Sequence, residues 1–202
     1  MNVAIIKYNA GNVQSVLYAM QRLGIDATVT DDYEKITKAD KVIFPGVGHA
    51  ASAMEYLKSK ELDKLIISLK QPVLGICLGL QLLCNDSEEG DTRCLGIFDA
   101  SVKRFEEKAT EEKSGQFKIP HMGWNDIYNL SSPLLNGIKE NSFVYYVHSY
   151  YAEIANETIA TTDYIHPFSA AMQKDNFYGV QFHAEKSAST GEQIISNFLK
   201  IK

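Results

Sequence analysis

The chain has 202 residues, of which 45% are hydrophobic and 22% are charged, as in an ordinary globular protein with room for one sizeable core. Its 20 basic and 25 acidic side chains give a formal net charge of −5, and no basic stripe stands out. This balance argues against a nucleic-acid partner. No stretch is long enough to span a membrane, and the N-terminus lacks the basic and long apolar regions of a signal peptide.

The cysteines point to a reducing compartment. There are three of them, Cys77, Cys84 and Cys94, which is an odd and small number for a disulfide framework. No C-x-x-C pair is present, so we expect no metal site. A cytoplasmic protein without a membrane partner is therefore expected.

Strands and helices alternate in the first half of the predicted structure. Strands are expected at 3–8, 27–30, 41–44 and 73–76, and helices at 12–23, 50–58, 61–70 and after 77. A short helix or turn is expected at 32–39. Asn12 is expected to cap the first helix, and Gly24 to end it. This alternation predicts an α/β fold with an open, mostly parallel sheet flanked by helices on both faces.

The second half is richer in strands. We expect strands at 119–128, 142–151, 158–163, 169–173 and 177–182, a short helix at 134–135 capped by residues 131–133, and a polar loop at 86–92. The charged stretch 103–113 is interpreted as a solvated hairpin or loop. A capping box of Ser189 and Glu192 predicts the start of the last helix. No linker or repeat is visible, so residues 1–202 are expected to form one domain.

The stretch around Cys77 carries the main chemical signal. Apolar residues 73–76 predict a buried strand, a leucine-rich helix start follows, and Gly75 and Gly79 flank the cysteine. This pattern is typical of a nucleophile elbow, a strained turn from strand to helix. The glycines allow a sharp turn and clear space beside the thiol, and the helix start favours the reactive thiolate.

A nucleophilic cysteine needs a base, and His183 is the best placed of the five histidines. It ends an apolar strand, as Cys77 does, and strand ends gather at one edge of a parallel sheet. Glu185 lies two residues later, so on extended backbone it would face the same side and orient the imidazole.

Acyl chemistry also needs donors for an oxyanion. The amide of Leu78 is one candidate, and a second is expected from Val47 or Gly48 in the loop 45–48. No G-x-G-x-x-G follows the first strand and no Walker sequence is present, so no nucleotide cofactor is expected.

With these residues the chain resembles the triad-type class I glutamine amidotransferases, and within them the glutaminase subunits of imidazole glycerol phosphate synthase. The resemblance spans the whole chain through the runs at 9–12, 45–48, 75–81, 120–125, 145–150 and 179–187. It implies a flavodoxin-like class I glutamine amidotransferase fold and no cofactor. One departure is Ala184, where the family usually has proline between histidine and glutamate. The position is a spacer, so we expect activity to survive.

The resemblance implies hydrolysis of glutamine to glutamate and ammonia. Cys77 would form a γ-glutamyl thioester, His183 would protonate the departing ammonia and then activate water, and Glu185 would orient His183. Gln81 would bind the substrate beside the backbone of His148, Ser149 and Tyr150.

The same resemblance implies a heterodimer with a (β/α)8 barrel cyclase subunit, which would receive the ammonia for histidine biosynthesis. Positions matching the interface are Asn12, Trp124, Asn125, Tyr145 and Lys186. For Trp124, a place in the core and a place at an interface remain equally physical interpretations. Because glycines make a peptide flip cheap, the loop 45–48 is expected to complete the oxyanion site only when the partner docks.

Two other enzymatic interpretations remain open. One is the glutaminase partner of pyridoxal phosphate synthase, which shares the Cys and His-x-Glu elements but lacks the run at 120–125. The other is a stand-alone cysteine hydrolase of γ-glutamyl substrates, which needs no partner. A binding subunit with a decayed triad is disfavoured, because Cys77, His183 and Glu185 are all present.

Overall fold

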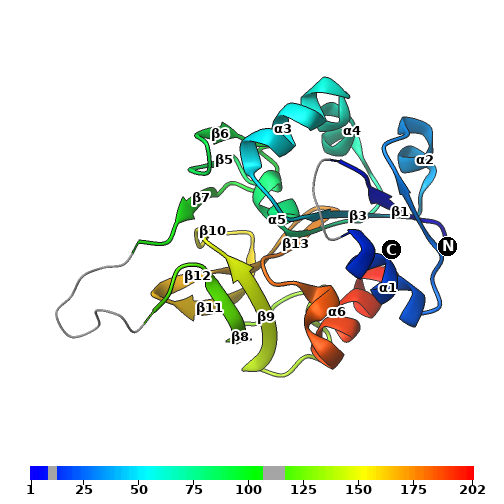
Figure 1. Cartoon of the computed structure of the whole chain (residues 1–202). Coiled ribbons are helices and arrows are strands. Elements are labelled where there is room, and N and C mark those ends of the chain that lie inside the picture. Colours follow the sequence, from blue (N-terminus) through cyan, green and yellow to red (C-terminus); the bar gives the residue numbers. More distant parts are fainter. Residues whose placement is uncertain (9–12, 107–116) are drawn as a thin grey trace.

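The computed structural model describes residues 1–8, 13–106 and 117–202. A seven-stranded sheet lies at its centre (Figure 1). The strand order is β11-β12-β13-β4-β3-β1-β2. Five strands are parallel: β1 (Val3–Ile6), β2 (Ala27–Thr30), β3 (Lys41–Gly46), β4 (Val73–Cys77) and β13 (Phe177–Val180). The edge strands β12 (His166–Lys174) and β11 (Thr158–Tyr164) run antiparallel. The mostly parallel sheet expected from the sequence is confirmed.

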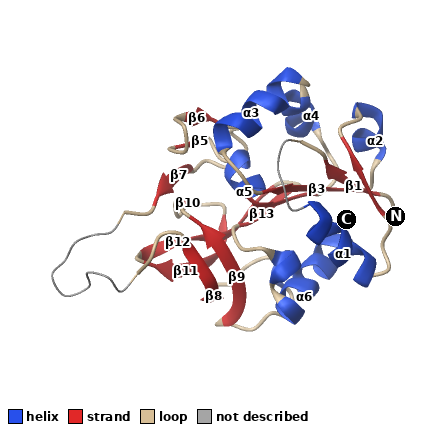
Figure 2. Cartoon of the chain, viewed as in Figure 1, coloured by secondary structure: helices blue, strands red, loops and turns tan. Residues whose placement is uncertain are grey.

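Helices cover both faces of this sheet (Figure 2). On one face lie α1 (Val13–Arg22) and α6 (Ala188–Lys200); on the other lie α2 (Tyr33–Lys38), α3 (Ala50–Ser59), α4 (Leu62–Ser68) and α5 (Leu78–Leu83). Alternation along the strands explains the two layers, because Ile5 and Ile43 join the core beneath α1 and α6 while Ile6 and Phe44 join the other. Within the described ranges, every helix is too short or too polar to cross a lipid bilayer.

Two smaller sheets form the rest of the second half. One sheet has four strands in the order β10 (Tyr150–Ala152), β7 (Ser101–Arg104), β5 (Asp86–Ser87) and β6 (Thr92–Arg93). The other sheet pairs β8 (His121–Ile127) with β9 (Ser142–His148). The polar loop expected at 86–92 therefore begins and ends in short strands. The strand expected at 142–151 is divided at Ser149, because β9 pairs with β8 whereas β10 pairs with β7. The start of the charged stretch lies in β7, and residues 107–113 lie outside the described part.

The capping predictions have mixed outcomes. Ser132 accepts a hydrogen bond from the Leu134 amide and caps the 3-10 turn Pro133–Leu135, as expected. The capping box of Ser189 and Glu192 is wrong, because α6 already begins at Ala188. Gly24 follows α1 with a φ of 72°, as expected of a helix end. Asn12 lies outside the described residues.

Helix α5 packs against the sheet backbone without intervening side chains. A Cβ on Gly79 would lie 1.8 Å from the Phe44 carbonyl oxygen of β3, and one on Gly75 would lie 2.8 Å from the backbone of Gly79. The two glycines thus allow α5 to lie close to the strands. From the sequence they were expected to allow a sharp turn and to leave space beside the thiol. The close packing of α5 against β3 and β4 fixes the position of the turn at Cys77.

Replacing Gly79 with alanine should cost about 3 kcal/mol of unfolding free energy, because the new methyl group meets backbone that cannot move aside. Urea unfolding would measure the loss. Gly24→Ala is the matched control, since its φ is 72° but its Cβ meets nothing within 4 Å. That variant should lose only the roughly 1 kcal/mol of backbone strain, and equal losses in the two variants would contradict the packing argument.

Candidate active site

Cys77 occupies the turn between β4 and α5 in a strained conformation. Its φ of 53° and ψ of −109° lie where residues with a side chain rarely occur. The neighbouring strands pair Gly46 with Cys77 and Ile76 with Val180. The ends of β3, β4 and β13 therefore meet at one edge of the sheet, and the thiol stands between them, as a nucleophile elbow requires.

His183 and Glu185 form a buried pair beside this thiol. The Nδ1 atom of His183 lies 2.8 Å from the Oε1 atom of Glu185. Because the carboxylate accepts the Nδ1 proton, the Nε2 atom is the one left to face Cys77, which lines the same pocket. The pair was expected from extended backbone, but it forms across the 3-10 turn Ala184–Lys186.

The electrostatics of the trio favour a charged imidazole. Burial by itself lowers the pKa of His183, but its hydrogen bonds and charge interactions with Cys77 and Glu185 outweigh burial and raise the pKa to about 10. A proton on His183 is therefore held between an acceptor carboxylate and the sulfur. This arrangement can deliver a proton to a leaving group bound at the thiol.

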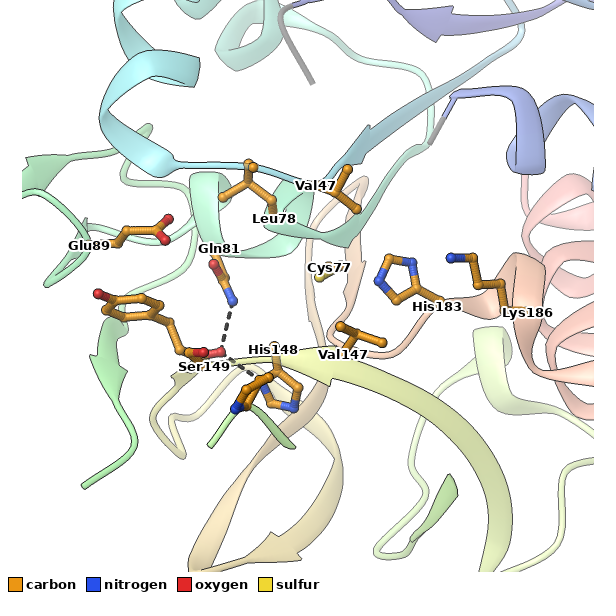
Figure 3. A pocket seen from close by; sticks show the side chains of 13 residues that line it. Val47, Cys77, Leu78, Gln81, Glu89, Val147, His148, Ser149, His183 and Lys186 are labelled. Atoms are coloured by element: carbon orange, nitrogen blue, oxygen red, sulfur yellow. Dashed lines mark hydrogen bonds between the residues drawn. The ribbon is translucent and has the colours of Figure 1, made fainter. Parts of the chain in front are cut away.

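A pocket of about 380 Å³ opens over Cys77 (Figure 3). Its volume lies in the usual range of small-molecule sites. The lining brings together all the residues predicted for catalysis, oxyanion binding and substrate binding except buried Glu185, which reaches the pocket through His183. The other lining residues are Glu89, Pro120, Val147 and Lys186.

Gln81 is held at the pocket wall by both hydrogens of its amide. Its Nε2 atom donates to the Tyr150 carbonyl at 2.9 Å and to the Gln181 Oε1 atom at 3.1 Å. The Oε1 atom of Gln81 is therefore the part of the amide left for a ligand. Gln181, which the sequence interpretation did not single out, also donates from Nε2 to the Cys77 sulfur at 3.7 Å. Its place in the run 179–187, two residues before His183, was the available signal.

Glu89 was missed altogether, because it was assigned to a polar surface loop. Its carboxylate points toward Gln81 on the same side of the pocket (Figure 3) and accepts a hydrogen bond from the Ala50 amide at 2.7 Å. The pocket therefore contains a fixed negative charge opposite the thiol. A carboxylate here suits a ligand that carries an ammonium group.

The loop 45–48 borders the pocket on the other side. Val47 and Gly48 line it together with Leu78, and Gly48 has a φ of 127°, which other residues rarely adopt. The buried hydroxyl of Tyr8 donates to the Pro45 carbonyl at 2.6 Å and anchors the start of this loop. The three predicted oxyanion donors are thus close to Cys77.

The residues predicted for a partner interface lie in different environments. Trp124 is 52% exposed, which rules out the core, and it contacts Tyr145 edge to face. Lys186 is exposed at the pocket rim. The side chain of Asn125 is half-buried and donates inward to the Asp163 carbonyl. Asn12 lies outside the described residues.

An apolar face surrounds Trp124. We use "β8–β9 face" for the outward side chains of the two-stranded sheet, which are Met122, Trp124, Phe143, Tyr145 and Val147. Met122 is 63% exposed and Phe143 is 58% exposed. Because Val147 also lines the pocket, this face is continuous with the pocket mouth.

Comparison with known proteins identifies the family of the chain. The model of the family described as glutamine amidotransferase class-I matches residues 4–201. The chain is 57% identical over 201 residues to "Imidazole glycerol phosphate synthase subunit HisH" of Bacteroides fragilis (strain YCH46), with 100% of both chains covered. It is 45% identical to the protein of the same name from Yersinia pseudotuberculosis, again with 100% of each covered.

Solved structures agree at the level of fold. A protein described as a GMP synthase subunit from Thermoplasma acidophilum superposes with a TM-score of 0.74 at 18% identity, covering 99% of this chain and 92% of that one. A glutamine amidotransferase from Thermotoga maritima gives 0.65 at 18% identity, covering 99% and 83%. The chain therefore belongs to the class-I glutamine amidotransferase family, in the branch of the HisH subunits.

Proposed function

We propose that this chain is the glutaminase subunit of an imidazole glycerol phosphate synthase and that it supplies ammonia for histidine biosynthesis. The observation that carries the proposal is the strained Cys77 facing the buried pair of His183 and Glu185 in one pocket. The full-length relatives named HisH support the choice of subunit.

The geometry supports a two-step hydrolysis. The Cys77 thiolate attacks the side-chain amide carbon of glutamine, and the negative charge on the carbonyl oxygen is met by amides from Leu78 and the Val47–Gly48 loop. The C–N bond breaks as His183 gives its proton to the nitrogen. Ammonia departs, and the γ-glutamyl group remains bound to Cys77 as a thioester. His183 then takes a proton from water, hydroxide attacks the thioester, and glutamate and the free thiol are released.

The far end of the pocket suits the α-amino group of glutamine. Glu89 supplies a negative charge and Gln81 presents an acceptor oxygen, so both favour the substrate ammonium. The Tyr150 carbonyl already accepts from Gln81 and from His148 Nδ1, so we assign it to positioning Gln81.

The β8–β9 face supports a partner protein. Exposed aromatic side chains next to the pocket mouth are typical of an interface core, and a stand-alone hydrolase has no use for them. We propose the (β/α)8 barrel cyclase as the partner, with ammonia leaving past Val147 and Lys186. Three unpaired cysteines fit a cytoplasmic enzyme.

Replacing Cys77 with alanine should abolish glutamine hydrolysis and leave the fold intact, because a small side chain is lost at the pocket surface. Ammonia-dependent synthesis by the complex should remain. Cys84→Ala and Cys94→Ala are the controls: both thiols are buried, and burial raises the pKa of each, so they should lose little catalysis. Hydrolysis near the wild-type rate in Cys77→Ala would show that Cys77 is not the nucleophile.

Trp124→Ala should weaken complex formation by tenfold or more and uncouple the two activities, because an exposed aromatic anchor is lost. Titration calorimetry with the cyclase would measure the affinity. Tyr18→Ala is the matched control, since Tyr18 is a similarly exposed aromatic residue, at 55%, but lies on α1 and not on the β8–β9 face. Unchanged affinity in Trp124→Ala would remove the β8–β9 face from the interface.

The chain alone should hydrolyse glutamine about 10²–10³-fold more slowly than the complex with cyclase ligand, as expected for a missing oxyanion donor in the loop 45–48. The difference should appear mainly in kcat. Steady-state assays of the chain, the complex and the liganded complex would show it. Equal kcat in all three would favour a stand-alone hydrolase.

A further inference from the structure

Two buried histidines outside the proposed catalytic trio connect strand β8 to the substrate pocket. The Nδ1 atom of His121 lies 3.0 Å from the Nε2 atom of His148, and His148 Nδ1 lies 2.7 Å from the Tyr150 carbonyl. Tyr150 in turn accepts from Gln81. At the other end, Asn125 Nδ2 lies 3.4 Å from His121 Nε2.

The direction of each hydrogen bond in this series follows from the groups at its two ends, the Asn125 amide and the Tyr150 carbonyl. The Tyr150 carbonyl can only accept, so His148 carries its proton on Nδ1. The Asn125 amide is fixed because Oδ1 accepts from the Asp126 amide and Nδ2 donates to the Asp163 carbonyl. Nδ2 is therefore a donor toward His121, and His121 Nε2 is an acceptor.

Only one assignment satisfies both ends. His121 must carry its proton on Nδ1 and donate it to His148 Nε2. All bonds then point the same way, from Asn125 through His121 and His148 to Tyr150. Protonating either imidazole would set two donors face to face, so both rings are neutral.

The surroundings hold both rings in that state. Burial lowers the pKa of His121 to about 4, and burial is also the main reason that the pKa of His148 is lowered to about 3. Tyr164 stacks on His121 at 3.8 Å between centroids, and Phe105 lies 5.4 Å from His148. Packing and burial thus hold both rings in place and screen them almost completely from water.

We propose that His121 and His148 are positioning residues that hold the Gln81 amide through the Tyr150 carbonyl, so that Gln81 presents its oxygen to the substrate ammonium. The proposal rests on the glutaminase function proposed above. It also gives a physical link between the partner and the pocket. Trp124 lies on the outward side of β8, whereas His121 and Asn125 lie on its inward side. A shift of β8 on docking would therefore reach Tyr150 through the hydrogen bonds of His121 and His148.

The tautomers provide a direct test. Long-range ¹H–¹⁵N correlation spectra of histidine-labelled protein at pH 7, free and with the cyclase, should show both rings neutral with the proton on Nδ1. A proton on Nε2 of either ring, or a charged ring, would overturn the proposal. This measurement uses the wild-type chain and does not depend on a variant folding.

Kinetics of three variants test the role in positioning. His121→Phe keeps an aromatic ring but removes the donor to His148, and we expect kcat/KM for glutamine to fall about tenfold or more, mostly through KM. His121→Asn restores a donor near the Nδ1 position and should recover most of the loss. Tyr164→Phe is the control: it removes the bond from its hydroxyl to the Lys118 carbonyl in the same aromatic cluster and should leave KM unchanged.

The outcomes separate this proposal from the proposed function. An unchanged KM in His121→Phe, or an equal loss in His121→Asn, would overturn the positioning role. If the wild-type complex hydrolysed no glutamine, the glutaminase function itself would fail, and the tautomer measurement would still decide whether the hydrogen-bond chain exists.

Discussion

The close approach of α5 to the sheet is the constraint on which the rest of the site depends. Without side chains at Gly75 and Gly79, the first turn of α5 rests on the backbone of β3 and β4. The chain must then turn within one residue, and Cys77 takes the strained conformation. The same contact places the end of β3, and therefore the loop 45–48, beside the thiol. Nucleophile and oxyanion loop are thus positioned by one backbone contact.

The two walls of the pocket come from different halves of the chain. The sheet edge supplies Cys77 and Gln81, and the strand-rich half supplies His148, Ser149 and His183. The hydrogen bonds of Gln81 to Tyr150 and Gln181 join the walls. Because an exposed β8–β9 face begins where the pocket opens, a partner bound there would cover the mouth and keep ammonia from water.

Local patterns predicted the sheet and the elbow well, because hydrophobic alternation and paired glycines act over a few residues. They predicted the pairing of His183 with Glu185 for the wrong reason, since an extended strand and a 3-10 turn both bring these side chains together. Glu89 could not be found, because a polar loop has no periodicity that fixes its direction. The contact of His121 with His148 depends on the register of β8 against β9, which no local pattern specifies. The break between β9 and β10 at Ser149 could not be predicted, because no proline or glycine marks it in the sequence.

The insertion of β13 between β4 and β12 has a consequence for the growing chain on the ribosome. Cys77 and Gln181 contact one another across 104 residues of sequence, and His183 follows still later. Strands β1 to β4 emerge early and can pair in parallel, so the thiol is in place long before its base. Until β13 docks, the thiol lacks both its proton donor and the Gln181 side chain that donates to the sulfur. A nascent or truncated chain therefore cannot consume glutamine, and the chemistry begins only when the last strand of the sheet has been added.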